Sequence, residues 1–133
     1  MIDLMALDWL AILIATAVAF VLGGLWYGPL FGQAWMGALG KTEEDIEPTP
    51  TPFVISFFTA LLTCILVAAL MLALAIETVI GGAVFGLVVG IGFIATAMAS
   101  DSAFCGWGVR LFLIQAGYRV AYSVLMGAII GAF

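Results

Sequence analysis

The sequence contains no histidine and no asparagine, and only 8% of its 133 residues are charged. Without histidine, the chain lacks the usual axial ligand of haem and the commonest protein ligand of zinc, copper and iron. A Ser–His or Cys–His nucleophile pair cannot be assembled from it either. We therefore expect no enzymatic activity, no catalytic residues, no metal site and no cofactor. A bound lipid, quinone or carotenoid stays compatible with this composition.

Positive charge is also scarce, with three Lys and Arg residues against eight Asp and Glu, a net charge of −5. Such a chain cannot neutralise a row of phosphates, so we expect no nucleic-acid partner. Soluble domains carry about 25% charged residues, whereas this chain is 66% hydrophobic. Lipid must therefore cover most of its surface, which predicts one transmembrane domain over residues 1–133. The two cysteines, Cys64 and Cys105, form no paired ligand motif, and we interpret them as inert thiols.

Four apolar stretches are each long enough to span a bilayer, which takes about 20 residues. They predict an all-α integral membrane protein, a small bundle of four transmembrane helices. The expected helices cover residues 9–30, 53–76, 79–100 and 109–131. Glu77 is the only charge between the second and third stretches, so the chain is expected to turn back near it, helped by Gly81 and Gly82.

The segment between the first two helices, residues 31–52, is expected to lie at the membrane interface. It combines Trp35 with an acidic loop and a stiff connector containing three prolines. Its four carboxylates belong to Glu43, Glu44, Asp45 and Glu47. A cation site and a solvated loop are both compatible with these carboxylates, and we favour the solvated loop because the spacing of a calcium-binding loop is absent.

Small residues recur at every fourth position in three of the expected helices, where they would let neighbouring backbones pack closely. These positions are Ala11, Ala15, Ala19 and Gly23; Gly82, Gly86 and Gly90; and Gly127 with Gly131. For the middle group we prefer helix packing to a glycine-lined pore. Aromatic residues near the helix ends are expected to anchor the protein at the membrane interfaces. They are Trp9, Trp26, Tyr27, Trp35 and Trp107.

Arg119 is a charge in the middle of the fourth apolar stretch. It lies nine residues beyond Arg110, about 14 Å along a helix and so near the bilayer midplane. Gln115, Arg119 and Tyr122 share one helical face, which makes them a candidate polar site. Asp101, in the loop expected between the third and fourth helices, is a possible partner on the same side of the membrane. Arg119 either fixes helix packing or lines a cavity that binds an anion, a lipid headgroup or a partner, and the sequence leaves both open.

Lys41 and Arg110 fall on the same side of a membrane crossed four times. The positive-inside rule then places them in the cytoplasm and both termini in the periplasm of a bacterial inner membrane.

Two stretches resemble a known family. The first is GGLWYGPLFGQAWM over 23–36, and the second is LIQAGYR over 113–119 with MGAIIG over 126–131. They are similar to the end motifs of the bacterial membrane family called domain of unknown function 1761, and the acidic loop from Thr42 to Asp45 also fits. The resemblance implies a small, roughly four-helix membrane protein without an assigned activity. The family pattern has histidine where this chain has Arg119, which puts a role requiring imidazole in doubt here.

Three functions compete on these observations. We favour a structural or accessory subunit that associates with itself or with a larger membrane complex through the small-residue stripes. The second is a transporter or channel for a small solute, with Gln115, Arg119 and Tyr122 along its path. The third is a protein that binds a lipid, quinone or carotenoid in a groove beside Arg119.

Overall fold

The computed structural model describes residues 3–42, 44 and 49–133, and every regular element among them is helical. Eight of these described elements are α or π helices, and the short 3-10 helix η1 precedes them. In chain order they are η1 (Leu4–Ala6), α1 (Trp9–Leu25), the π-helix η2 (Trp26–Leu30), α2 (Gly32–Leu39), α3 (Thr51–Ala73), α4 (Val79–Val89), the π-helix η4 (Gly90–Ala95), α5 (Thr96–Cys105) and α6 (Gly108–Ala132).

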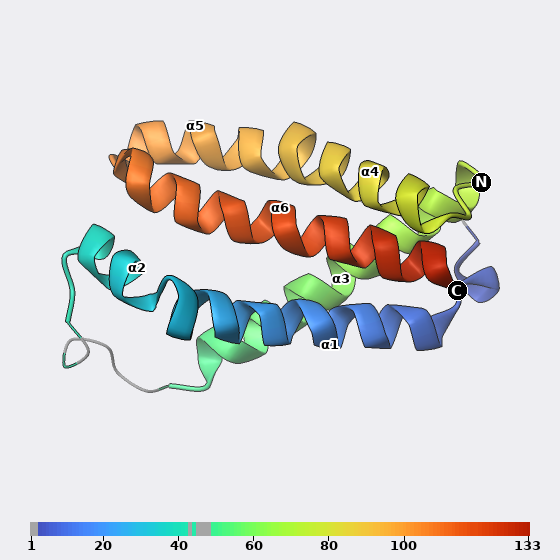
Figure 1. Ribbon diagram of the computed structural model, residues 1–133, viewed down its shortest axis with the longest axis horizontal. Coiled ribbons are helices and arrows are strands. Elements are labelled where there is room, and N and C mark those ends of the chain that lie inside the picture. The colour runs from blue at the N-terminus through green and yellow to red at the C-terminus, as the bar shows by residue number, and fades with distance from the viewer. Residues whose placement is uncertain (1–2, 43, 45–48) are drawn as a thin grey trace.

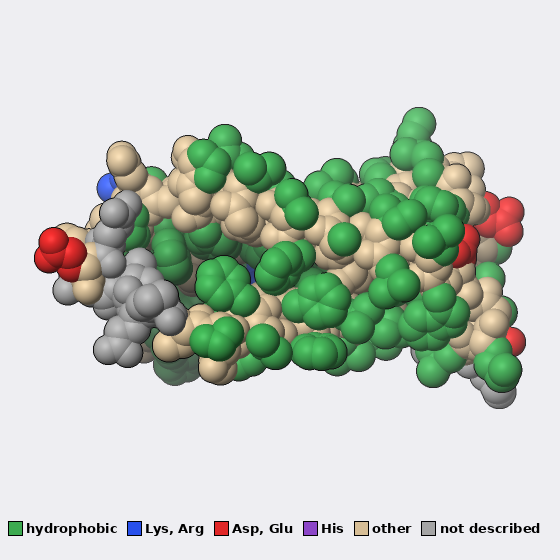
Figure 2. Space-filling view, turned by 90° about the horizontal axis from the view of Figure 1, so that it is seen from below, with side chains coloured by type: hydrophobic (Ala, Val, Ile, Leu, Met, Phe, Trp, Pro, Cys, Tyr) green, Lys and Arg blue, Asp and Glu red, His purple; other side chains and the backbone are tan. Residues whose placement is uncertain are grey.

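Four continuous helical spans are long and apolar enough to cross a membrane. They are Trp9–Leu30, Thr51–Ala73, Val79–Cys105 and Gly108–Ala132. Figure 2 shows hydrophobic side chains over the middle of one face and carboxylates at its two ends, as expected for a molecule surrounded by lipid. The predicted fold class, an all-helical bundle of four membrane-spanning helices, is confirmed.

Helix α6 is the centre of the bundle. It packs along α1 on one side and along α4, η4 and α5 on the other, while α3 crosses behind α1 (Figure 1). Both ends of the chain and the α3–α4 turn lie at one end of the molecule. The end of α2 and the α5–α6 turn lie at the other, which places Lys41 and Arg110 at the same end.

The turn between α3 and α4 differs from the expected one. Helix α3 ends at Ala73, and Ala75 adopts a left-handed conformation with φ of 56°. The Thr78 side chain then caps α4 by accepting a hydrogen bond from the Gly81 backbone N–H. Gly81 and Gly82 therefore lie inside α4, and the prediction that they form the turn was wrong.

The loop expected before the last helix is also shorter than predicted. Helix α5 continues through Asp101 to Cys105, and the Ser102 carbonyl accepts hydrogen bonds from the backbone N–H groups of Gly106 and Trp107. Gly106, with φ of 70°, ends the helix in a left-handed conformation that glycine adopts easily. Asp101 is thus an exposed helical residue rather than a loop residue.

The predicted acidic loop falls largely outside the described residues. Glu43, Asp45 and Glu47 are not described, and neither is Pro48. The cation site that was the alternative interpretation of this loop therefore lies outside the described residues. Of the preceding interfacial segment, Gly32–Leu39 forms the short helix α2.

Close contact between α4 and α6 depends on glycine. A Cβ atom at Gly82 would collide with the carbonyl oxygen of Gly127, and one at Gly86 would collide with that of Ser123. A Cβ atom at Gly131 would collide with the Thr78 carbonyl oxygen, and one at Gly90 would lie 2.9 Å from the Val120 Cα. These glycines pack two helices of the same chain against each other.

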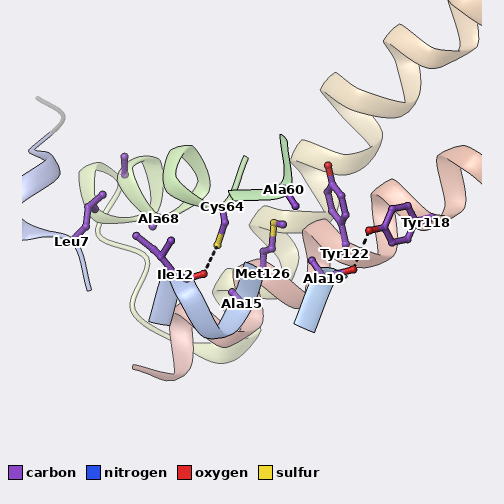
Figure 3. Close-up of a cluster of buried hydrophobic side chains, with 11 residues drawn as sticks. Leu7, Ile12, Ala15, Ala19, Ala60, Cys64, Ala68, Tyr118, Tyr122 and Met126 are labelled. Atoms are coloured by element: carbon purple, nitrogen blue, oxygen red, sulfur yellow. Dashed lines mark hydrogen bonds between the residues drawn. The ribbon is translucent and has the colours of Figure 1, made fainter. Parts of the chain in front are cut away.

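The alanines of the first stripe also lie inside the bundle. Ala11, Ala15 and Ala19 are buried in α1, where the neighbouring Ile12 packs against α3. Figure 3 shows the Cys64 thiol of α3 directed at the Ile12 carbonyl oxygen, with sulfur and oxygen 3.6 Å apart. The stripes that suggested association with another protein are therefore occupied by contacts within this chain.

Candidate functional site

The first part of the site is the π-helical turn η2, which brings Trp26 onto α6. Pro29 lies inside this turn and has no backbone N–H to donate. The helix is wider at this π-helical turn, where the Phe31 N–H donates a hydrogen bond of 2.8 Å to the carbonyl of Trp26, five residues earlier. The Trp26 indole N–H donates in turn to the Ile114 carbonyl of α6, at 2.9 Å. The two stretches that carry the family resemblance are thus hydrogen-bonded to each other.

The absence of side chains at two glycines allows this contact. A Cβ atom at Gly117 would lie 3.1 Å from the Trp26 ring, and one at Gly23 would lie 2.8 Å from the Tyr118 hydroxyl. Tyr118 uses the space above Gly23 to donate a hydrogen bond to the Ala19 carbonyl (Figure 3). Its ring is therefore fixed in the seam between α1 and α6.

Four aromatic rings form a continuous row across this seam, which we call the aromatic row. Trp35 of α2 packs against Tyr27 with ring centroids 4.9 Å apart, and Tyr27 packs against Tyr118 at 5.5 Å. Tyr118 packs in turn against Tyr122 at 5.1 Å. All three pairs are edge-to-face, the arrangement that the ring quadrupoles favour.

The guanidinium of Arg119 lies beside the inner end of the aromatic row. Its central carbon is 5.3 Å from the Tyr118 ring centroid and 5.5 Å from that of Tyr122. Both distances fall within cation–π range, about 6 Å. The residue is partly exposed, midway along a membrane-spanning helix. Within the part of the chain that the structure describes, the guanidinium forms no ion pair and no hydrogen bond.

The residues predicted to share this site are only partly brought together. Tyr122 is buried and its ring contacts the Arg119 guanidinium. Gln115 is partly exposed, and its amide has no hydrogen bond to another described residue. Asp101 is exposed on α5 and forms no ion pair with any described residue. The structure therefore offers no support for Asp101 as the counter-ion of Arg119.

Tyr118, Tyr27 and Trp26 have roles that the sequence reasoning did not assign. No role is predicted for Tyr118 from the sequence, although it directly precedes Arg119 and shares a helix face with Tyr122, four residues later. Trp26 and Tyr27 were expected to anchor the membrane interface, but both are partly buried against α6. The signal for this inward packing was Pro29, which redirects the chain just after them.

The other expected anchors differ in exposure. Trp9 is 44% exposed at the start of α1, and Trp107 is partly exposed in the α5–α6 turn. Trp35 is partly buried, and its indole Nε1 is a buried atom without a hydrogen-bond partner among the described residues.

Two hollows in the surface lie away from Arg119. One of about 380 Å³ opens at the end that holds both termini, where Asp8 and Glu77 line it together with apolar side chains. The second, about 310 Å³, is an apolar groove between α1 and Leu125 of α6. Among the described residues, no three His, Cys, Asp or Glu side chains are grouped as a metal site would require.

Comparison with known proteins relates the chain to one family. The model of the family described as "Protein of unknown function (DUF1761)" matches residues 10–131, nearly the whole chain. No curated protein and no solved structure matches the chain. The matched range includes the π-helical turn, the aromatic row and Arg119, so the whole site described above lies within the residues that the family model covers. The chain therefore belongs to the DUF1761 family of proteins of unknown function.

Proposed function

We propose that this protein binds an anionic phospholipid in the membrane, with the lipid phosphate held by Arg119. The observation that carries the proposal is the partly exposed Arg119, whose guanidinium lies beside the Tyr118 and Tyr122 rings and lacks an anionic partner among the described residues. Guanidinium and phosphate match in geometry and form paired, charge-assisted hydrogen bonds.

The energy of placing arginine in a membrane supports a bound anion. An arginine at the centre of a spanning helix costs about 2.5–3.5 kcal/mol on insertion scales. Cation–π contacts return about 0.5–2 kcal/mol each, depending on how far they are desolvated. An anion bound to the exposed part of the guanidinium would offset the remaining cost and neutralise the charge.

The surroundings of Arg119 favour a lipid over a soluble anion. Apolar side chains cover the middle of the spans, so a ligand reaches this depth through the bilayer. Helical side chains lean toward the start of their helix, and the start of α6 lies at the end of the molecule where α2 also ends. Phosphate groups in the near leaflet can meet Arg119 because long basic side chains extend toward the interface.

Association with a second copy or a larger complex receives less support than the sequence suggested. The small residues that argued for it pack α1 and α4 against helices of the same chain. A solute path is likewise not supported by the two hollows, because Arg119 lines neither of them.

Native mass spectrometry in a mild detergent tests the proposal. The purified protein is titrated with phosphatidylglycerol, and the same titration is made on Arg119→Leu and on Arg110→Leu. Arg110 is the matched control because it is an exposed arginine at the start of the same helix. We expect Arg119→Leu to weaken lipid binding at least tenfold, since a hydrogen bond to a charged group contributes about 1.5–3 kcal/mol. Arg110→Leu should change it little.

Three results would contradict lipid binding at this site. Equal binding by both variants would remove Arg119 from the site. Saturation by inorganic phosphate at the same concentration as the lipid would identify a soluble anion as the ligand. Co-purification of another membrane protein that is lost in Arg119→Leu would identify a partner carboxylate instead.

A further inference from the structure

Gln115 is a second polar side chain inside the last membrane span, one helical turn before Arg119. It is partly exposed, and its amide forms no hydrogen bond with any described residue. Since the bilayer core holds no water to bond such a group, an amide at this depth needs a partner that the described chain does not supply. The same span therefore carries two unpartnered polar groups, one charged and one neutral.

Gln115 and Arg119 lie on one open face of α6. Residues four apart on a helix are neighbours, with Cβ atoms about 5–6 Å apart. Phe112, one turn nearer the start of the helix, is partly exposed as well, whereas Leu111 and Ala116 on the two flanks of this face are buried. The open positions thus form a strip that runs from near the start of α6 to Arg119, and a lipid of the near leaflet can follow it.

The two side chains differ in what they can bind. A guanidinium only donates hydrogen bonds, whereas a glutamine amide both donates and accepts them. Arg119 therefore suits the phosphate oxygens, and the Gln115 carbonyl oxygen suits a hydroxyl group of the ligand. The headgroup of a lipid leaves its phosphate on the side of the membrane surface, which is the side of Arg119 on which Gln115 lies.

We propose that Gln115 determines the specificity of the lipid site, its amide oxygen accepting a hydrogen bond from a headgroup hydroxyl beside the phosphate held by Arg119. This inference rests on the proposed function. It narrows the ligand to an anionic phospholipid whose headgroup carries a hydroxyl group, such as phosphatidylglycerol. An anionic phospholipid with an alkyl headgroup satisfies Arg119 alone.

Native mass spectrometry with two matched lipids provides the test. Phosphatidylpropanol has the same single charge and a three-carbon headgroup like that of phosphatidylglycerol, but no headgroup hydroxyl. We expect the wild type to bind phosphatidylglycerol about fivefold more tightly, the equivalent of one hydrogen bond of about 1 kcal/mol. Gln115→Met, which keeps the length of the side chain and removes the amide, should abolish this preference. Gln33→Met is the matched control and should retain it, since Gln33 is the other glutamine and is exposed on α2.

Side-chain amide resonances give a second measurement that needs no substitution in the site. The protein is labelled with 15N-glutamine, placed in a phosphate-free maltoside detergent, and titrated with short-chain forms of the two lipids. The chain has two glutamines, and Gln33→Met assigns their signals. We expect phosphatidylglycerol to shift the Gln115 amide signal more than phosphatidylpropanol does, while the Gln33 signal responds equally to both. These spectra keep the test valid even where Gln115→Met folds poorly.

The two proposals fail in distinguishable ways. Binding that depends on Arg119 but does not distinguish the two lipids, or a preference that persists in Gln115→Met, overturns the role of Gln115 alone. Equal shifts of the Gln115 signal with both lipids also overturn it. Binding of both lipids that is unchanged in Arg119→Leu overturns the lipid site and, with it, this inference. A soluble glycerol phosphate that shifts the Gln115 signal at the same concentration as the lipid would overturn a lipid as the ligand of either residue.

Discussion

The Tyr118 hydroxyl donates a hydrogen bond of 2.9 Å to the carbonyl oxygen of Ala19, joining the last membrane span to the first. The two residues are 99 positions apart in the sequence. Ala19 lies one helical turn before Gly23, where a side chain would meet the same hydroxyl at 2.8 Å. The position of the Tyr118 ring, and through it the surroundings of Arg119, therefore depends on a glycine in another helix.

Gly23→Ala should destabilise the protein by about 1–3 kcal/mol, the usual cost of adding a methyl group to a packed site. The measurement is reversible unfolding in mixed detergent micelles. Gly24→Ala is the matched control, because nothing lies within 4 Å of a Cβ there; it should be neutral or stabilising by up to about 1 kcal/mol. In a Tyr118→Phe background the cost of Gly23→Ala should shrink, since the hydroxyl that collides is gone. Equal costs in the two backgrounds would contradict the contact.

Trp26→Phe should lower stability by about 0.5–1.5 kcal/mol, since it removes the indole donor to the Ile114 carbonyl. Further loss is expected from the smaller ring, because Trp26 also packs against Gly117. The comparison is Trp9→Phe, at an exposed position of the same span, which should change the free energy of unfolding by less than about 0.5 kcal/mol. A larger effect at Trp9 than at Trp26 would mean that Trp26 does not dock on α6.

Gly86→Ala should cost about 3 kcal/mol, because its Cβ would meet the backbone of Ser123 and force α4 away from α6. Backbone atoms cannot move aside as a flexible side chain can. Gly92→Ala in the same span provides the control, since a Cβ there has no neighbour within 4 Å. Unfolding in detergent again reports the difference. Similar stability of the two variants would show that α4 and α6 are not in close contact.

The expected orientation is tested by thiol accessibility in a bacterial host. Cys105 is exposed at the end that carries Lys41 and Arg110, while Cys64 is buried and should stay unlabelled. With Lys and Arg facing the cytoplasm, a membrane-impermeant maleimide should label Cys105 only after the membrane is opened. Glu77→Cys, made with Cys105→Ala, lies at the opposite end and should be labelled in intact cells. The reverse pattern would place both termini in the cytoplasm.

Local sequence signals were sufficient to predict the spans and the unusual position of Arg119. The length of an apolar run is enough to identify a membrane-spanning helix. A charged residue inside such a run can be read directly from the sequence. The glycine spacing in the third span likewise indicated close packing, and Gly82 and Gly86 do lie against α6.

Contacts between distant segments could not be predicted in the same way. Nothing in the spacing around Tyr118 indicates that its hydroxyl meets Ala19, because that contact depends on how α1 and α6 are aligned. Trp26 was predicted to be an interface anchor because it lies near the end of the first apolar stretch. The π-helical turn around Pro29 directs it inward instead. The prediction that Asp101 lies in a loop was wrong. Hydropathy does not reveal that the helix continues to Cys105 and is ended by Gly106.

The most direct measurement is the proximity of lipid phosphorus to the Arg119 guanidinium in a membrane. The chain has only two arginines, so Arg110→Gln leaves Arg119 as the sole guanidinium. That variant, labelled with 15N-arginine, is reconstituted in phosphatidylglycerol and studied by 15N–31P dipolar recoupling in solid-state NMR. We predict strong dephasing of the guanidinium signal, since the donor–acceptor distance of such a pair is about 2.7–2.9 Å. A guanidinium signal unaffected by 31P would contradict lipid binding at Arg119.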